Sequence, residues 1–244
     1  MSDSKIFGLH AVKEALETQQ DIDKLFIQKA ISSAGIKEIE HAAKTANIQI
    51  SYVPLEKLNK LSKNGNHQGV IASCSPIPIL DIENLVENAF KSTPTPIFIL
   101  LDQISDVRNL GAIIRTAEAI GAQGIILPKQ GTASINEQTV KTSTGAIFNI
   151  PICKVDHLKD ALFFLKSYDV KSIAATEKTD QLVYDIDLNF PLALIMGSEG
   201  KGVTSGILKM VDYKAKLPML GSTSSLNVSV ACGAILYEIV RQRL

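Results

Sequence analysis

Short apolar runs alternate with helical patterns throughout the second half of this chain. Five such runs occur, at residues 97–101, 124–127, 147–153, 172–175 and 192–196. Apolar strands that alternate with helices are typical of a mostly parallel sheet covered on both faces. The pattern therefore predicts an α/β fold of the doubly wound type. Ligands bind such folds where the carboxyl ends of the strands meet, so we expect a site in the segments that follow these runs.

A proline-rich stretch separates this region from the first 75 residues. Proline fixes φ and pushes the preceding residue towards extended geometry, so residues 76–96 are predicted to be a linker, with one short helix at 81–90. In residues 1–75, helical patterns at 9–17, at 36–46 and after Pro54 alternate with strand patterns at 24–28, 48–53 and 69–73. This order predicts a small α/β domain, followed by the linker and a larger domain at 97–244.

Composition and charge exclude several classes of protein. The chain has 25 basic and 25 acidic residues, so an RNA partner would need a local patch formed by folding. No apolar run is long enough to span a bilayer, and the N-terminus lacks a signal sequence. Three widely spaced cysteines and four scattered histidines predict neither disulfides nor a metal site. We therefore expect a cytoplasmic protein with no membrane association.

The first motif, Asn109-Leu-Gly-Ala-Ile-Ile-Arg115, follows the apolar run at 97–101. Asn109 is expected near the start of a helix, where its side chain can cap free backbone amides. Arg115 lies off the apolar pattern of that helix. Taken alone, the motif favours a capped helix with a solvated arginine. The alternative is that Arg115 grips an RNA phosphate, because a guanidinium matches phosphate geometry.

The second motif, Met196-Gly-Ser-Glu-Gly-Lys-Gly202, is dense in glycine and follows the last apolar run. Its glycine order is neither the dinucleotide-binding fingerprint nor a Walker A loop, so nucleotide hydrolysis has little support. Either a tight turn or close backbone approach to a ligand explains the glycines. Glu199, taken alone, is a charge suited to a helix N-terminus.

The third motif spans residues 217–228 and carries the strongest signal. A turn at Gly221 is followed by Ser222, Thr223, Ser224, Ser225 and Asn227, and then by a helix predicted to reach about Arg241. An apolar stripe at helical spacing should be buried in that helix. Alone, the motif could be a capped terminal helix. Three such motifs in this order make that interpretation improbable.

Together these motifs resemble those of the SpoU (TrmH) branch of the SPOUT RNA 2′-O-ribose methyltransferases. The resemblance covers nearly the whole chain. It implies a C-terminal α/β-knot domain with a deep trefoil knot, although threaded chains are otherwise rare. Gly8-Leu-His10 and His67-Gln-Gly-Val70 resemble the N-terminal L30e-like RNA-binding domain that many of these enzymes carry. S-adenosylmethionine is the implied methyl donor, no metal is implied, and a homodimer through the knot domain is expected.

The resemblance also implies roles for individual residues. The implied catalytic residues are Asn109, Arg115, Glu199, Ser225 and Asn227. The implied cofactor-binding residues are Gly197, Gly202, Leu217, Met219 and Leu226. The implied RNA contacts are Arg115, His67 and Gln68, although a loop histidine is more often simply solvated.

The expected substrate is a guanosine of 23S rRNA, because the two-domain layout looks closest to bacterial enzymes with that target. No DNA partner is expected. One alternative is a sister enzyme acting on a tRNA guanosine, but that branch usually lacks the N-terminal domain and carries basic extensions. The other alternative is an RNA-binding protein without catalysis, which would not need the full set of motif residues.

Overall fold

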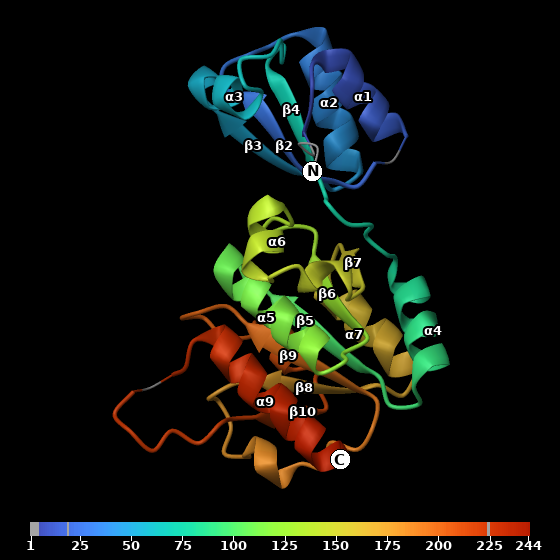
Figure 1. Cartoon of the computed structure of the whole chain (residues 1–244), viewed down its shortest axis with the longest axis vertical. Coiled ribbons are helices and arrows are strands. Elements are labelled where there is room, and N and C mark those ends of the chain that lie inside the picture. The colour runs from blue at the N-terminus through green and yellow to red at the C-terminus, as the bar shows by residue number, and fades with distance from the viewer. Residues whose placement is uncertain (1–4, 19, 224) are drawn as a thin grey trace. The chain divides into compact units, whose positions relative to one another are not determined.

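The computed structural model describes residues 5–18, 20–223 and 225–244, which fall into two compact units (Figure 1). The first contains the chain up to Pro78 together with Ser134–Glu137, and the second contains Ile79–Ala133 and Gln138–Leu244. The segment predicted as a linker contains helix α4 (Ile82–Ser92). Leu85, Val86 and Ala89 of this helix lie in the core of the second unit, so the helix is part of that unit.

The first unit is built on a four-stranded sheet with strand order β1-β4-β2-β3. Its elements are β1 (Lys5–Phe7), α1 (Leu9–Glu17), β2 (Ile22–Gln28), α2 (Ala34–Thr45), β3 (Gln49–Val53), α3 (Leu55–Leu61) and β4 (Val70–Cys74). Helices α1 and α2 pack on Leu25 and Ile27, while Leu58 of α3 packs with Ile71 on the other face. Strand β1 was not predicted, because three residues are too few to show an alternating pattern.

The second unit is built on a six-stranded, all-parallel sheet with strand order β10-β8-β9-β5-β6-β7. Its strands are β5 (Ile97–Asp102), β6 (Gly124–Pro128), β7 (Ile152–Val155), β8 (Lys171–Ala175), β9 (Leu192–Gly197) and β10 (Tyr213–Ala215). Every residue of β5 and β9 is buried. The predicted α/β fold with a mostly parallel sheet is therefore confirmed.

One strand prediction in this unit was wrong, and one strand was missed. The apolar run at 147–153 is not one strand: it begins in the 3-10 turn η1 (Ala146–Phe148), and β7 starts only at Ile152. Strand β10 was missed because it is three residues long and carries a lysine at its centre.

Helices cover both faces of the parallel sheet (Figure 1). Helices α4 and α7 (Leu158–Ser167) share a core with Phe98, Leu100 and Ile195. Alternate strand residues point to the opposite face, where α5 (Val107–Ala119) and α9 (Val228–Arg243) contact β6 and β9 and pack against each other. The remaining elements are α6 (Glu137–Thr142), η2 (Val183–Asp185) and α8 (Ser205–Leu208).

The C-terminal end of α9 is anchored by polar contacts. The Arg243 guanidinium donates hydrogen bonds to the backbone oxygens of Thr95, Leu188 and Phe190. These bonds fix the far end of the helix whose first turn reaches the candidate active site. Among the described residues, no helix has the length and apolar character needed to cross a membrane. The trefoil knot stays a prediction of the resemblance.

Candidate active site

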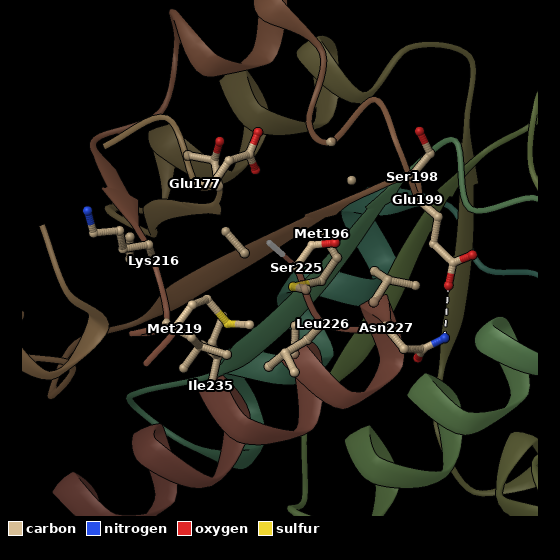
Figure 2. A pocket seen from close by; sticks show the side chains of 18 of the residues that line it. Glu177, Met196, Ser198, Glu199, Lys216, Met219, Ser225, Leu226, Asn227 and Ile235 are labelled. Carbon is tan, nitrogen blue, oxygen red and sulfur yellow. Dashed lines mark hydrogen bonds between the residues drawn. The ribbon is translucent and has the colours of Figure 1, made fainter. Parts of the chain in front are cut away.

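A cavity of about 630 Å³ opens at the carboxyl ends of β8, β9 and β10 (Figure 2). Because all strands of this sheet are parallel, their following loops gather at one edge. The loop after β9 and the N-terminal half of α9 complete the wall. The lining residues include Ala175, Thr176, Glu177, Met196, Gly197, Ser198, Glu199, Gly202, Lys216, Leu217, Met219, Ser225, Leu226, Asn227, Ala231 and Ile235.

All five residues predicted to hold the cofactor line this cavity. Met196, Ala231 and Ile235 supply apolar surface, while backbone and short polar groups lie around it. An apolar pocket of several hundred Å³ with a few polar groups is the usual form of a small-molecule site. The roles of the five residues remain proposals, but their placement is compatible with them.

The glycine-rich loop after β9 folds back closely on its own strand. A Cβ on Gly197 would overlap the backbone of Gly202 and Val203, so no other residue fits there without moving the loop. Gly200 and Gly202 have φ angles of 83° and 68°, which suit glycine. The Gly202 amide donates a hydrogen bond to the backbone oxygen of Ser198 at 2.8 Å. These contacts fix the conformation of the loop beside the cavity.

A buried carboxylate fixes the end of this loop. The Thr204 amide donates to Oδ2 of Asp102 at 2.7 Å, and Asp102 is the last residue of β5. Asp102 is only 5% exposed. The side chain thereby ties the loop from β9 to the neighbouring strand.

Three side chains, one from each sequence motif, form a connected polar cluster. Asn227 Nδ2 donates to Glu199 Oε1 at 2.8 Å and to Asn109 Oδ1 at 3.0 Å. Asn109 Nδ2 donates to the same Glu199 oxygen at 2.9 Å. Figure 2 shows the contact between Glu199 and Asn227 at the cavity wall. The three motifs, which lie up to 118 residues apart, therefore meet at one place.

The same cluster is attached to the start of two helices. Asn227 is the N-cap of α9, and its Oδ1 accepts hydrogen bonds from the amides of Ser229 and Val230. The N-cap of α5 is Asp106, which accepts from the Arg108 and Asn109 amides. The expectation that Asn109 caps its helix was therefore wrong. Because Asp106 satisfies those amides, the Asn109 side chain is left to contact Glu199.

Arg115 lies in the second half of α5 and is exposed. It does not line the cavity, and within the described residues its guanidinium has neither a hydrogen bond nor an ion pair. Ser225 is exposed at the cavity wall. Ser224 lies outside the described residues.

Sequence reasoning missed the residues that follow β8. Glu177 lines the cavity, and Figure 2 shows it on the side away from Asn227. It is exposed and has no hydrogen-bond or salt-bridge partner in the described part of the chain. Lys216, also in the wall, is paired with Asp180 at 3.2 Å. The signal for Glu177 was its position directly after a predicted strand, where ligand-binding residues of parallel sheets gather.

The two predicted RNA contacts of the first unit have structural roles. His67 is buried: its Nε2 lies 2.9 Å from Asn59 Oδ1 and its Nδ1 accepts from the Gly69 amide. Both ring nitrogens are therefore engaged within the protein, and its contact with RNA stays a prediction. Gln68 Oε1 accepts from the Leu9 amide at the start of α1. Gln68 is nevertheless exposed, so its contact with RNA stays a prediction.

Two of the cysteines are unsuited to act as nucleophiles because their thiols are buried. Cys232 lies in the buried stripe of α9, and burial raises the pKa of its thiol to about 12. Burial likewise raises the pKa of Cys153 to about 12. At neutral pH both thiols stay protonated and unreactive. No cluster of three or more metal-ligating side chains occurs among the residues described.

Comparison with known proteins decides the family. The profile of the SpoU rRNA Methylase family matches residues 96–237, and a profile described as RNA 2′-O ribose methyltransferase substrate binding matches residues 5–80. The chain belongs to the SpoU methyltransferase family. The first match contains the whole cavity, together with Asn109 and Arg115.

Some relatives of this SpoU protein match it over nearly its whole length, so the match includes both units. It is 35% identical to the Bacillus subtilis protein named "Putative TrmH family tRNA/rRNA methyltransferase YacO", over 98% of this chain and 95% of that protein. Its fold is similar to the S-adenosylmethionine-bound rRNA methyltransferase from Sinorhizobium meliloti, with TM-score 0.62, 25% identity, and coverage of 98% of this chain and 87% of the other.

A shorter relative matches only part of the chain. The A. aeolicus TrmH/SpoU tRNA modifying enzyme has TM-score 0.56 and 30% identity, over 66% of this chain and 84% of its own. The SpoU protein is thus an S-adenosylmethionine-dependent RNA methyltransferase. Transfer to a ribose 2′-oxygen is consistent with the description of the N-terminal profile.

Proposed function

We propose that this chain transfers a methyl group from S-adenosylmethionine to the ribose 2′-oxygen of a guanosine in 23S rRNA. The observation that carries the proposal is the meeting of three motifs at one cavity, through the bonds that join Asn109, Glu199 and Asn227. An rRNA target is favoured because the similarity to an rRNA methyltransferase spans 98% of the chain, whereas the tRNA enzyme matches 66%.

The cavity residues suit the cofactor. S-adenosylmethionine supplies a methyl group on a sulfonium, which is already reactive towards an oxygen nucleophile. The apolar residues Met196, Ala231 and Ile235 suit an adenosine, and the backbone at Gly197, Leu217 and Leu226 offers hydrogen-bonding groups. Glu177 adds an unpaired carboxylate for a donor group of this cationic ligand. We assign cofactor binding to these residues together with Met219 and Gly202.

The catalytic work left to the protein is alignment and proton removal. The polar cluster holds the first turn of α9, so Asn227 orients the target ribose indirectly, by positioning that turn, and Ser225 can contact it. Arg115 binds the adjacent phosphate. A guanidinium is hardly ever deprotonated in proteins, so Arg115 positions the RNA and stabilises charge while the proton leaves through a phosphate oxygen or water. Alignment of two reacting groups alone contributes several orders of magnitude in rate.

The proposal also gives each part of the chain a role and assigns an oligomeric state and a location. Residues 1–75 bind RNA and residues 97–244 carry catalysis, while the predicted linker at 76–96 connects them and contributes α4 to the core of the second unit. A homodimer forms through α9, because Val230 and Tyr237 are each 57% exposed although they are large and apolar. With Ala234 they share one exposed helix face, at the spacing of one and two turns. An enzyme with an rRNA target is expected in the cytoplasm.

Methyl transfer from radiolabelled S-adenosylmethionine to separate pools of unmodified 23S rRNA, 16S rRNA and tRNA tests the proposal. We expect 2′-O-methylguanosine in 23S rRNA alone. A signal in tRNA alone would keep the chemistry and overturn the substrate. No transfer to any pool, together with no cofactor binding, would favour an RNA-binding protein without catalysis.

A further inference from the structure

The charged residues of the first unit are unevenly divided between the two sides of its sheet. Helices α1 and α2, on one side, carry four glutamates and three lysines: Glu14, Glu17, Glu38, Glu40, Lys13, Lys37 and Lys44. Helix α3 and the strand residues on its side carry four lysines and one glutamate: Lys5, Lys24, Lys57, Lys60 and Glu56. One side is therefore basic although the whole chain has no net charge.

Two lysines of the basic side lie over one aromatic ring. The Lys24 ammonium lies 5.7 Å from the Phe26 ring centroid, and that of Lys57 lies 5.8 Å from the same point. Lys60 is exposed on α3, three residues after Lys57, and therefore lies on the same part of the helix. A strand lysine and two helix lysines thus form one continuous surface.

The sheet register extends this surface across the strands. Ser73 pairs with both Lys5 and Lys24, and Lys24 pairs with Gln49. Directly opposed residues of a sheet point to the same face, so these four form a polar row next to Phe26. Each of the four is only half-buried, because the seven-residue helix α3 is too short to cover them. We call Lys5, Lys24, Lys57, Lys60 and Phe26 the basic face.

We infer that the basic face binds the sugar–phosphate backbone of the RNA substrate. Lysines neutralise phosphates and release condensed counterions, which is the main source of sequence-independent affinity for nucleic acids. An aromatic ring among basic residues also offers a base a surface for stacking. The positive charge favours an anionic ligand. Among such ligands RNA is favoured, because residues 5–80 match a profile for binding of an RNA substrate. The inference rests on the proposed RNA substrate, and it adds the basic face to the contacts predicted for His67 and Gln68.

A matched pair of triple variants of the full-length protein tests the inference. One is Lys24→Ala/Lys57→Ala/Lys60→Ala, and the control is Lys13→Ala/Lys37→Ala/Lys44→Ala on the α1–α2 side. The probe is a fluorescent single-stranded RNA of mixed sequence, titrated over a series of salt concentrations. We expect the first variant to bind at least about tenfold more weakly, with a salt slope lower by about 2, because each lost phosphate contact on a single strand removes about 0.7. The control should match the wild type.

A charge-retaining variant separates lost charge from lost structure. Lys24→Arg/Lys57→Arg/Lys60→Arg should bind the probe as the wild type does. Unchanged RNA affinity and salt slope in the alanine variant, or an equal loss in the control, would overturn the inference and leave an acidic protein as the candidate occupant. Cofactor affinity, measured by calorimetry, should be the same in all variants. If the wild type methylated no RNA pool while the alanine variant still lost RNA binding, the proposed function would fail and the basic face would stand.

Discussion

The polar residues assigned to binding and catalysis are of two kinds, which differ in whether their hydrogen-bonding groups have partners within the protein. Asn109, Glu199 and Asn227 bind one another, and Asn227 also caps α9. Arg115 and Glu177 are charged, exposed and without partners among the described residues. All five residues lie in the second unit.

This difference separates positioning from ligand binding. Side chains whose groups are satisfied within the protein hold the loops in one arrangement, so changing them should alter geometry and stability together. An exposed charge without a partner adds little to folding. Its removal should alter binding or rate and leave stability nearly unchanged. Substitutions in both kinds of residue, and in the loop that carries Glu199, test whether these two roles are separate.

Gly197→Ala should have the largest effect on the site and on stability together. The added methyl would overlap the backbone of Gly202 and Val203, which cannot move without displacing the loop that carries Glu199. We expect cofactor binding to be lost and the melting temperature to fall by several degrees, since overpacking costs about 1–3 kcal/mol. Calorimetric titration with S-adenosylmethionine and thermal melts would check this. Gly221→Ala, where a Cβ meets nothing within 4 Å, is the matched control.

Asn109→Asp tests the polar cluster. It replaces the donor to Glu199 with a second carboxylate at hydrogen-bonding distance, and two carboxylates that share a site cannot both ionise easily. We expect methyl transfer to fall about ten- to a hundredfold near neutral pH, since one lost charge-assisted bond is worth about 1.5–3 kcal/mol.

Acid should partly restore the Asn109→Asp variant, because a shared proton recreates the bond. The measurement is the ratio of variant to wild-type transfer rate as the pH is lowered from neutral. A ratio that stays constant with pH would contradict a direct role for the Asn109–Glu199 bond.

Glu177→Gln tests the unpartnered carboxylate. We expect cofactor affinity to fall about tenfold, equivalent to about 1.4 kcal/mol, with no change in melting temperature. Glu83→Gln on α4 is exposed, lies outside the cavity and should bind the cofactor normally. Titration with 5′-methylthioadenosine, which has the ribose hydroxyls but no ammonium, would identify the group contacted. Unaltered affinity for S-adenosylmethionine would remove Glu177 from the site.

Glu238 provides a smaller effect that belongs to folding alone. The hydrogen bond from the Arg241 side chain lowers the pKa of Glu238 to about 2, below its ordinary value of 4.5. A lowered folded-state pKa stabilises the fold above the ordinary value, and this stabilisation is lost as the pH falls towards the lowered one. Wild-type stability should therefore decline between pH 4.5 and about 2, and Glu238→Gln should decline less steeply in that window. Chemical denaturation at several pH values measures this, and equal slopes would contradict it.

Much of the fold could be predicted from the sequence because buried parallel strands are continuous apolar runs. Residues 97–101 and 192–196 were identified in this way and form the fully buried β5 and β9. Strands β1 and β10 could not be found, since three residues carry no periodicity. Their places are set by pairing with β4 and β8, which is tertiary information.

Site residues could be predicted where they belong to a recognisable sequence motif. The five predicted cofactor residues line the cavity because a glycine-rich loop and a polar turn after strands are local features. The bonds from Asn109 to Glu199 and between His67 and Asn59 could not be predicted, because these partners are brought together only by folding. Glu177 belongs to no motif, and only its position after β8 indicated it.

The most direct test is single-turnover methyl transfer by Arg115→Ala at saturating cofactor and 23S rRNA. We expect a rate at least about a hundredfold below wild type, the usual cost of removing one group that stabilises transition-state charge. Melting temperature and cofactor affinity should be unchanged, because the guanidinium has no partner in the described protein. Wild-type transfer by Arg115→Ala would contradict the proposed mechanism.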